Sequence, residues 1–221
     1  MKDPKPHSFS TQLKFGTAGL RAEMGDGPEK MNSFAIQQVT QGIAHYILTF
    51  PEEERRNGFV ICHDCRNHSR EFAEETAKVL AGNGIRAHIV PALRPTPFCS
   101  YAIRKLGALG GINITASHNR KEYNGYKVYW SDGAQVVPPH DEQIIASVDA
   151  ITNLDVVKMA PLEDPLISTI GAEIEEAYLQ DILTLSIHAS QNRAKGDRIR
   201  IAFTPLHGTG LTMIPKAILS L

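Results

Sequence analysis

The chain has 221 residues, of which 42% are hydrophobic and 21% are charged. This composition is typical of a globular protein and excludes disordered, collagenous and coiled-coil chains. At this length about 70% of the surface of the extended chain can be buried, so a core can form without cross-links. The formal net charge is −1, without the positive excess of proteins that bind nucleic acid or anionic membranes, and we expect neither as a partner.

The sequence predicts a cytoplasmic protein. No apolar run follows the N-terminal lysines, and no stretch approaches the ~18 apolar residues of a membrane span. The three cysteines are an odd number, which fits a reducing compartment. Cys62 and Cys65 form a C-x-x-C pair, so a redox or metal pair is one interpretation. The other, which we favour, is that a cysteine closing a buried strand packs as a small hydrophobe.

The glycine-rich stretch from Phe15 to Gly27 predicts a loop, after which Asn32 or Ser33 is expected to cap a helix that Pro51 ends. The elements expected next are a strand at 59–61, a helix stopping at Gly82 or Gly84, a strand at 85–90, a short helix from Pro97 to near Gly107, strands at 111–115 and 126–130, and helices at 141–151 and 172–189. Strands that alternate with helices predict an α/β fold with a parallel or mixed sheet.

The C-terminal part predicts a second unit. Residues 191–198 are polar and are expected to form a linker, followed by a strand at 199–203, a glycine-rich turn and an apolar helix at 211–221. One strand and one helix cannot bury each other's apolar faces. We therefore expect residues 1–190 to form one domain and residues 199–221 to be the truncated start of another, whose apolar surface packs on the first domain or drives self-association.

The stretch from Gly111 to Lys127 carries the strongest chemical signal. A strand leads into a Ser-His-Asn loop at Ser117, and Lys127 follows on the returning strand. Three cations and one carboxylate lie between Ala116 and Lys127, so the loop is basic in a nearly neutral chain. A hydroxyl held beside cations suits phosphoryl transfer, which depends on positioning and on stabilising the charge of the phosphoryl oxygens. From spacing alone, an exposed turn with scattered charges is the competing interpretation.

Other chemistries are less well supported. The adjacent pair Ser117 and His118 is not part of a G-x-S-x-G motif, and neighbouring loop residues rarely align as nucleophile and base, so a hydrolase is not favoured. Neither GTAGLR nor LHGTGL carries the G-K-[ST] ending of a Walker A loop.

Several ordered motifs resemble those of the α-D-phosphohexomutase superfamily, which contains phosphoglucomutases and phosphomannomutases. They are FGTAGLR from Phe15, D-x-R-x-x-S from Asp64, RPTP from Arg94, TASHN from Thr115 and NGYK from Asn124. KVYWSDGAQ, with an arginine after SHN, is most similar to the phosphoglucomutase/phosphopentomutase branch, which includes glucose-1,6-bisphosphate synthase. The resemblance implies the first domain of that fold, a mixed sheet with helices on both faces, followed by the first strand and helix of a similar second domain.

The resemblance also implies roles for single residues. Ser117 matches the phosphoserine that gives its phosphoryl group to a sugar and takes one back from a sugar bisphosphate, and its phosphate oxygen would be a ligand of Mg²⁺. His118 and Lys127 match residues of proton transfer and phosphate stabilisation. Asn119 is expected to orient the loop, and Arg21 matches an arginine near the phosphoserine.

Two further expectations concern neighbouring charges. Arg120 and Lys121 are assigned with Asn119 to phosphate and substrate binding, although Arg120 stands where other branches have proline, which leaves the sugar preference open. Asp64 and Arg66 are expected to form a structural ion pair.

The family's other parts have no match in this sequence. Aspartates never occur at alternating positions, so the D-x-D-x-D magnesium loop is missing, as are the sugar-reading and distal phosphate loops. The resemblance therefore implies the phosphoserine-bearing part of a sugar-phosphate mutase, inactive alone, whose full-length form is activated by a sugar bisphosphate. The alternative is a naturally short phosphosugar-binding or assembly module.

Overall fold

The computed structural model describes Leu13, Gly16 and residues 19–220. Residues 15, 17 and 18 of the FGTAGLR motif therefore lie outside the described residues. The described strands form one mixed sheet in the order β1-β5-β4-β2-β3-β6. Their bounds are β1 (Leu20–Glu23), β2 (Phe59–His63), β3 (Ala87–Ile89), β4 (Gly110–Ile114), β5 (Tyr123–Trp130) and β6 (Ile167–Thr169). Strands β4, β2, β3 and β6 are parallel, whereas β5 runs antiparallel to both β4 and β1.

The helices begin and end close to the predicted residues in the first part of the chain. They are α1 (Ser33–Ile47), α2 (Glu52–Arg55), α3 (Ser69–Gly82), α4 (Thr96–Leu106), α5 (His140–Asp149), α6 (Ala172–Leu183), α7 (Ala189–Lys195) and α8 (Ile214–Leu219). The Asn32 side chain caps α1 by accepting a hydrogen bond from the backbone N–H of Ala35, and Gly107 ends α4 in the left-handed conformation. None of these described helices is long and apolar enough to cross a membrane.

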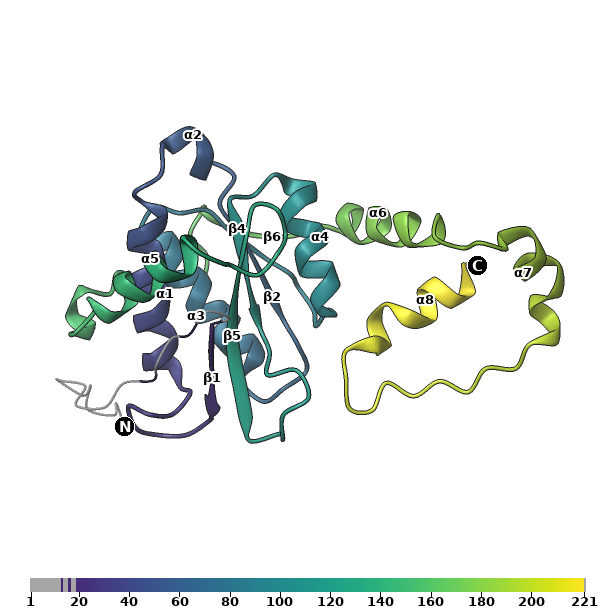
Figure 1. Ribbon diagram of the computed structural model, residues 1–221, viewed down its shortest axis with the longest axis horizontal. Helices are drawn as coiled ribbons and strands as arrows, with labels where there is room; N and C mark the ends of the chain where they lie inside the picture. Colours follow the sequence, from purple (N-terminus) through teal and green to yellow (C-terminus); the bar gives the residue numbers. More distant parts are fainter. Residues whose placement is uncertain (1–12, 14–15, 17–18, 221) are drawn as a thin grey trace.

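The sheet lies between two helical layers. On β2, Phe59 and Ile61 enter a core shared with α1, α3 and α5, while Val60 and Cys62 enter a second core shared with α4 and α6. Alternate side chains of a strand point to opposite faces, so a strand buried on both sides is apolar throughout. Figure 1 shows α1, α3 and α5 on one side of the sheet and α4 on the other. The predicted α/β fold with helices on both faces is confirmed.

The order of the strands places a topological switch point between β2 and β4. From β2 the chain passes through α3 to β3 on one side, and from β3 it returns through α4 to β4 on the other side of β2. The loops after β2 and β4 therefore leave neighbouring parallel strands in opposite directions. In open α/β sheets ligands bind at such a switch point, outside the carboxyl ends of the strands. The Ser117 loop and the Asp64–Ser69 motif both lie there.

Two short strands were missed by the sequence analysis. Residues 20–23, predicted as loop, form β1 at one edge of the sheet, and β6 forms the other edge. Gly19 allows β1 to lie against β5, because a Cβ at this position would stand 2.0 Å from the carbonyl oxygen of Tyr126, and its φ of +109° disfavours any other residue. Cross-strand pairing of this kind depends on distant residues, which a local pattern does not reveal.

The C-terminal part differs from its prediction. The helix expected at 172–189 ends at Leu183, and the expected linker is largely helical, as α7 and a 3₁₀ turn at Gly196–Arg198. The strand predicted at 199–203 was wrong: residues 200–203 make no backbone hydrogen bond to another described residue. A strand needs a partner for its N–H and C=O groups, and Figure 1 shows this segment, which follows α7, lying apart from the sheet.

The same segment exposes apolar side chains. Ile199, Ile201 and Phe203 are 57%, 61% and 40% exposed, so this part does not pack on the sheet domain. By contrast, Met213, just before α8, packs on the sheet domain, because it is buried in the core that contains α4 and α6. A polar link supports this contact, because Thr212 donates a hydrogen bond to the carbonyl of Leu93.

We propose that this apolar surface drives self-association. The variant Ile201→Lys should weaken association by about tenfold, because it places a charge in the centre of the contact. Val137→Lys is a matched control, since Val137 is also 61% exposed but follows β5, away from the segment. Sedimentation velocity over a range of concentrations measures the effect. A concentration-independent monomer for the unmodified chain would contradict the prediction.

Candidate functional site

Ser117 lies in the loop that leaves β4 at the switch point. Its side chain is exposed, and its φ of 57° places it in the left-handed region, where a residue other than glycine is uncommon. Its backbone N–H donates to Thr115 Oγ1 at 3.0 Å. The Nδ1 atom of His118 lies 3.3 Å from Ser117 Oγ, so these adjacent side chains do meet, contrary to our expectation for loop neighbours. This distance permits exchange of a proton between them.

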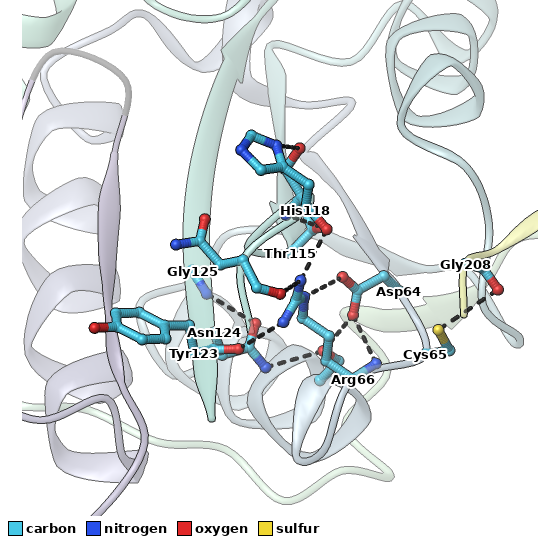
Figure 2. Close-up of polar contacts among 12 residues, drawn as sticks. Asp64, Cys65, Arg66, Thr115, His118, Tyr123, Asn124, Gly125 and Gly208 are labelled. Carbon is cyan, nitrogen blue, oxygen red and sulfur yellow. Dashed lines mark hydrogen bonds and ion pairs between the residues drawn. The ribbon is translucent and has the colours of Figure 1, made fainter. Parts of the chain in front are cut away.

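The guanidinium of Arg66 binds the underside of the Ser117 loop. Its Nη1 atom donates to the carbonyls of Arg120 and Tyr123 at 2.8 and 3.0 Å. Its Nη2 atom donates to the carbonyls of Ser117 and Asn119 at 2.8 and 2.7 Å. Figure 2 shows Arg66 at the centre of these contacts, with the imidazole of His118 pointing away from it. One side chain from the loop after β2 therefore fixes the loop after β4.

Asp64 holds Arg66 in turn. Its Oδ2 atom lies 3.3 Å from Arg66 Nε, and both side chains are nearly buried, at 10% and 11% exposure. Its Oδ1 atom accepts hydrogen bonds from the backbone N–H of Arg66 and from Ser69 Oγ. The expected ion pair is confirmed, and all three named residues of D-x-R-x-x-S join one network.

Asn124, at the start of the NGYK motif, extends this network to β5. Its side-chain amide donates to Ser69 Oγ and to the carbonyl of Asn67, both at 3.0 Å. Gly125 follows, and a Cβ there would stand 2.6 Å from the carbonyl oxygen of Thr115, so only glycine permits the close packing of β5 against the base of the loop. Sequence motifs that lie 57 residues apart thus meet in one hydrogen-bonded structure.

Arg21 reaches the other side of the loop. It lies on β1, paired with Gly125 of β5, and its Nη1 atom donates to Asn119 Oδ1 at 3.0 Å. Two arginines therefore hold Asn119 in place. Its side chain accepts a hydrogen bond from Arg21, and its backbone carbonyl accepts one from Arg66. This geometry brings Arg21 to the loop, as the sequence predicts.

Lys127 lies on β5 beside this group of cations. Its side chain is partly buried, and the pKa of its ammonium group is lowered by burial and then by repulsion from Arg21, while attraction from Asp64 opposes the shift. A lowered pKa makes an amine a better proton carrier near neutral pH. The charges of Arg21 and Asp64 are therefore close enough to Lys127 to change its pKa.

Arg120 and Lys121 are less closely joined to this region. Both are exposed. Arg120 lines a surface hollow of about 340 Å³ together with two carboxylates, Glu23 and Glu122, and with Tyr123. Their role in phosphate binding stays a prediction.

The cysteines do not form a disulfide. Cys62 is buried in β2, as expected for a packing residue, whereas Cys65 is exposed, with its Sγ atom 3.6 Å from the carbonyl oxygen of Gly208. The sequence did not predict this contact between the Asp64 loop and the C-terminal turn.

The described residues do not make a magnesium site. They contain no cluster of three or more histidine, cysteine or acidic side chains that could hold a metal ion. The positively charged side chains around Ser117 also repel a metal cation. Mg²⁺ needs several oxygen ligands, so one phosphate oxygen on Ser117 would not suffice. Within the described structure the charge near Ser117 is supplied by arginine and lysine.

The chain is similar to known proteins over most of its length. Residues 12–155 match the family model of phosphoglucomutase/phosphomannomutase, alpha/beta/alpha domain I. The chain is similar to human phosphopentomutase, with 37% identity over 95% of this chain and 35% of the relative. It is also similar to a phosphoglucomutase of Staphylococcus epidermidis, with 34% identity over 99% of this chain and 39% of the relative. Human glucose 1,6-bisphosphate synthase is 35% identical over 90% of this chain and 33% of its own length. The chain thus spans little more than a third of these relatives.

Solved structures show the same fold. A candidate phosphomannomutase from Thermus thermophilus superposes with a TM-score of 0.65 and 26% identity, over 80% of this chain and 36% of that one. Parafusin from Paramecium superposes with a TM-score of 0.59 and 21% identity, over 80% of this chain and 36% of that one.

The pKa of Lys127 offers a direct test of the charge arrangement. In Arg21→Gln we expect this pKa to rise toward the ordinary value of lysine, because a neighbouring positive charge is removed. NMR titration of the lysine Cε and Hε signals measures the shift. Arg70→Gln is a control, since Arg70 pairs with Glu74 on α3 and should leave the pKa unchanged. A pKa of Lys127 that stays the same in Arg21→Gln would contradict the arrangement.

Proposed function

The chain belongs to the phosphoglucomutase/phosphomannomutase family, and from this premise we propose that it is the phosphoserine-bearing part of a sugar-phosphate mutase. The mutase interconverts sugar 1-phosphates with 6-phosphates or 5-phosphates through a bisphosphate intermediate. Ser117 carries the phosphoryl group. The observation that carries the proposal is an exposed hydroxyl on a tightly held loop, with His118 at 3.3 Å and with Arg21 bound to the same loop.

In the transfer step, a hydroxyl oxygen of the sugar monophosphate forms a bond to phosphorus while the bond between phosphorus and Ser117 Oγ breaks. Lys127, as a neutral amine, accepts the proton of the sugar hydroxyl and so becomes a cation, and its lowered pKa supports this role. His118 returns a proton to Ser117 Oγ, which its Nδ1 atom approaches. The products are a sugar bisphosphate and a free serine, and the reverse step from the other phosphate restores the phosphoserine.

The cations stabilise charge in this step. The transferring phosphoryl group carries its charge on three equatorial oxygens, and fixed cations stabilise this charge without having to reorganise. Arg21 is placed by β1 and by its bond to Asn119, and Lys127 is placed by β5. Arg120 and Lys121 add positive charge at the exposed rim, where they meet a phosphorylated sugar.

The proposal assigns the remaining parts of the reaction to the longer protein. A mutase binds one sugar phosphate in two orientations, which needs a distal phosphate site, and the ligands that hold Mg²⁺ together with the Ser117 phosphate also lie outside this chain. We propose that residues 1–190 form the first domain, that residues 199–221 begin a second, and that the chain alone is inactive. A sugar bisphosphate phosphorylates Ser117 and so activates the natural-length protein, in the cytoplasm.

The choice between hexose and pentose phosphates needs an assay. The relatives are named for different sugars: a phosphopentomutase and a phosphoglucomutase are similar to this chain at 37% and 34% identity. Mutase activity of the natural-length protein with glucose 1-phosphate and with deoxyribose 1-phosphate, measured side by side, decides the preference. Binding of either sugar without turnover would favour the phosphosugar-binding module.

Ser117→Ala in the natural-length protein should reduce turnover by at least about 1,000-fold, because no hydroxyl remains to accept the phosphoryl group. The partly exposed Ser147, on α5, provides the control variant Ser147→Ala, which should keep full activity. A coupled assay with each sugar 1-phosphate and its bisphosphate gives the rates. Unchanged rates in Ser117→Ala would refute the assignment.

A further inference from the structure

Arg66 is too fully engaged with protein to bind a phosphate. The terminal nitrogens of a guanidinium carry four N–H groups, and each nitrogen of Arg66 donates to two carbonyls of the Ser117 loop. The Nε atom is buried, 3.3 Å from Asp64 Oδ2 in the ion pair, and makes no hydrogen bond to the described residues. The four terminal N–H groups are thus all used by the protein, and Nε is buried against it. This distinguishes Arg66 from Arg21, which makes a single side-chain bond to the loop.

The loop that Arg66 binds is strained at the reacting residue. Ser117 has a φ of 57°, and a residue other than glycine stays in this unfavourable region only where its surroundings hold it. Two contacts hold it: its carbonyl accepts from Arg66, and its N–H donates to Thr115. The carbonyls of residues 119, 120 and 123 are drawn to the same guanidinium.

These contacts also decide what faces an incoming phosphoryl group. Carbonyl oxygens repel a phosphate, and those of four loop residues are turned toward Arg66. Figure 2 shows the side chain of His118 pointing away from Arg66. Its Nδ1 atom lies 3.3 Å from Ser117 Oγ. The carbonyls of the loop therefore face Arg66, and the exposed hydroxyl of Ser117 lies on the outer side of the loop.

Resting on the proposed function of Ser117, we propose that Arg66 is the positioning residue for phosphoryl transfer: it holds Ser117 in its left-handed conformation and keeps the hydroxyl presented to the phosphoryl donor. It does so without touching the donor. Lysine cannot replace it, since an ammonium group has three N–H donors at one point and no planar fork.

The test follows phosphate ester formation on Ser117 in the natural-length protein. Protein stripped of phosphate is mixed with glucose 1,6-bisphosphate, and the rate is read by intact-protein mass spectrometry. Arg66→Lys should slow ester formation by about 10- to 100-fold, as expected for a misplaced reacting group. The KM for the bisphosphate should change little, because Arg66 makes no contact with it. Arg70→Lys, with its exposed side chain on α3, should keep the original rate.

Two further measurements separate positioning from a general loss of stability. Amide hydrogen exchange should become faster in residues 116–124 of Arg66→Lys, with no comparable change in α1 or α5. Free guanidinium ion should restore part of the rate in Arg66→Ala and none in Ser117→Ala. A role confined to stability predicts neither the localised exchange nor the rescue.

A milder variant covers the case in which Arg66→Lys does not fold. Asp64→Asn keeps the amide oxygen that can accept from Ser69 and from the backbone of Arg66, and it removes the charge that orients the guanidinium. It should slow ester formation less than Arg66→Lys does. Ester formation at the original rate in a folded Arg66→Lys, or in Asp64→Asn where Arg66→Lys does not fold, would overturn the proposal. No ester in the unmodified protein would overturn the proposed function of Ser117 instead, while the exchange measurement would still test the positioning.

Discussion

Four N–H groups of one arginine connect the two loops on which the site is built. The sheet brings the ends of β2 and β4 side by side, but their loops leave in opposite directions. Arg66, from the first loop, binds four carbonyls of the second and is itself held by Asp64. Because the side chains of Arg66 and Asp64 are nearly buried, the charge-assisted hydrogen bonds that Arg66 donates contribute more than they would from a fully exposed arginine. The position of Ser117 depends on this connection.

The charges of the site are divided between positioning and chemistry. Arg66 is neutralised by Asp64 and saturated by carbonyls, so it organises the loop. Arg21 and Lys127 come from β1 and β5, on the other side of the loop, and their mutual repulsion contributes to the lowered pKa of Lys127. Such repulsion is tolerated where a negative group is expected to bind. An anion between Arg21 and Lys127 would relieve it, which suits a phosphoryl group.

Sequence reasoning identified what is encoded locally. The continuous apolar run of β2, the cap at Asn32 and the stop at Gly107 each depend on a few adjacent residues, and the structure confirms them. The Ser117 loop was recognised because its strand, hydroxyl and cations are consecutive. The sequence also indicated the Asp64–Arg66 pair, since D-x-R is a short motif.

What the sequence missed depends on contacts between distant residues. Strand β1 exists because it pairs with β5, about a hundred residues later, and Gly19 permits the approach. The carbonyls that Arg66 binds are 51 to 57 residues away, and backbone carbonyls carry no signature in a sequence. The predicted strand at 199–203 has the alternation of a strand but lacks a partner, so its pattern alone could not decide its conformation.

The central claim is that Ser117 carries phosphate reversibly. Peptide-level mass spectrometry of the natural-length protein tests it most directly, in samples quenched after incubation with a sugar bisphosphate and again after a chase with the sugar monophosphate. The account predicts one phosphate ester, located on Ser117, which the chase removes as the sugar bisphosphate forms again. An ester on a different residue, an ester on Ser117 that survives the chase, or no ester at all would contradict it.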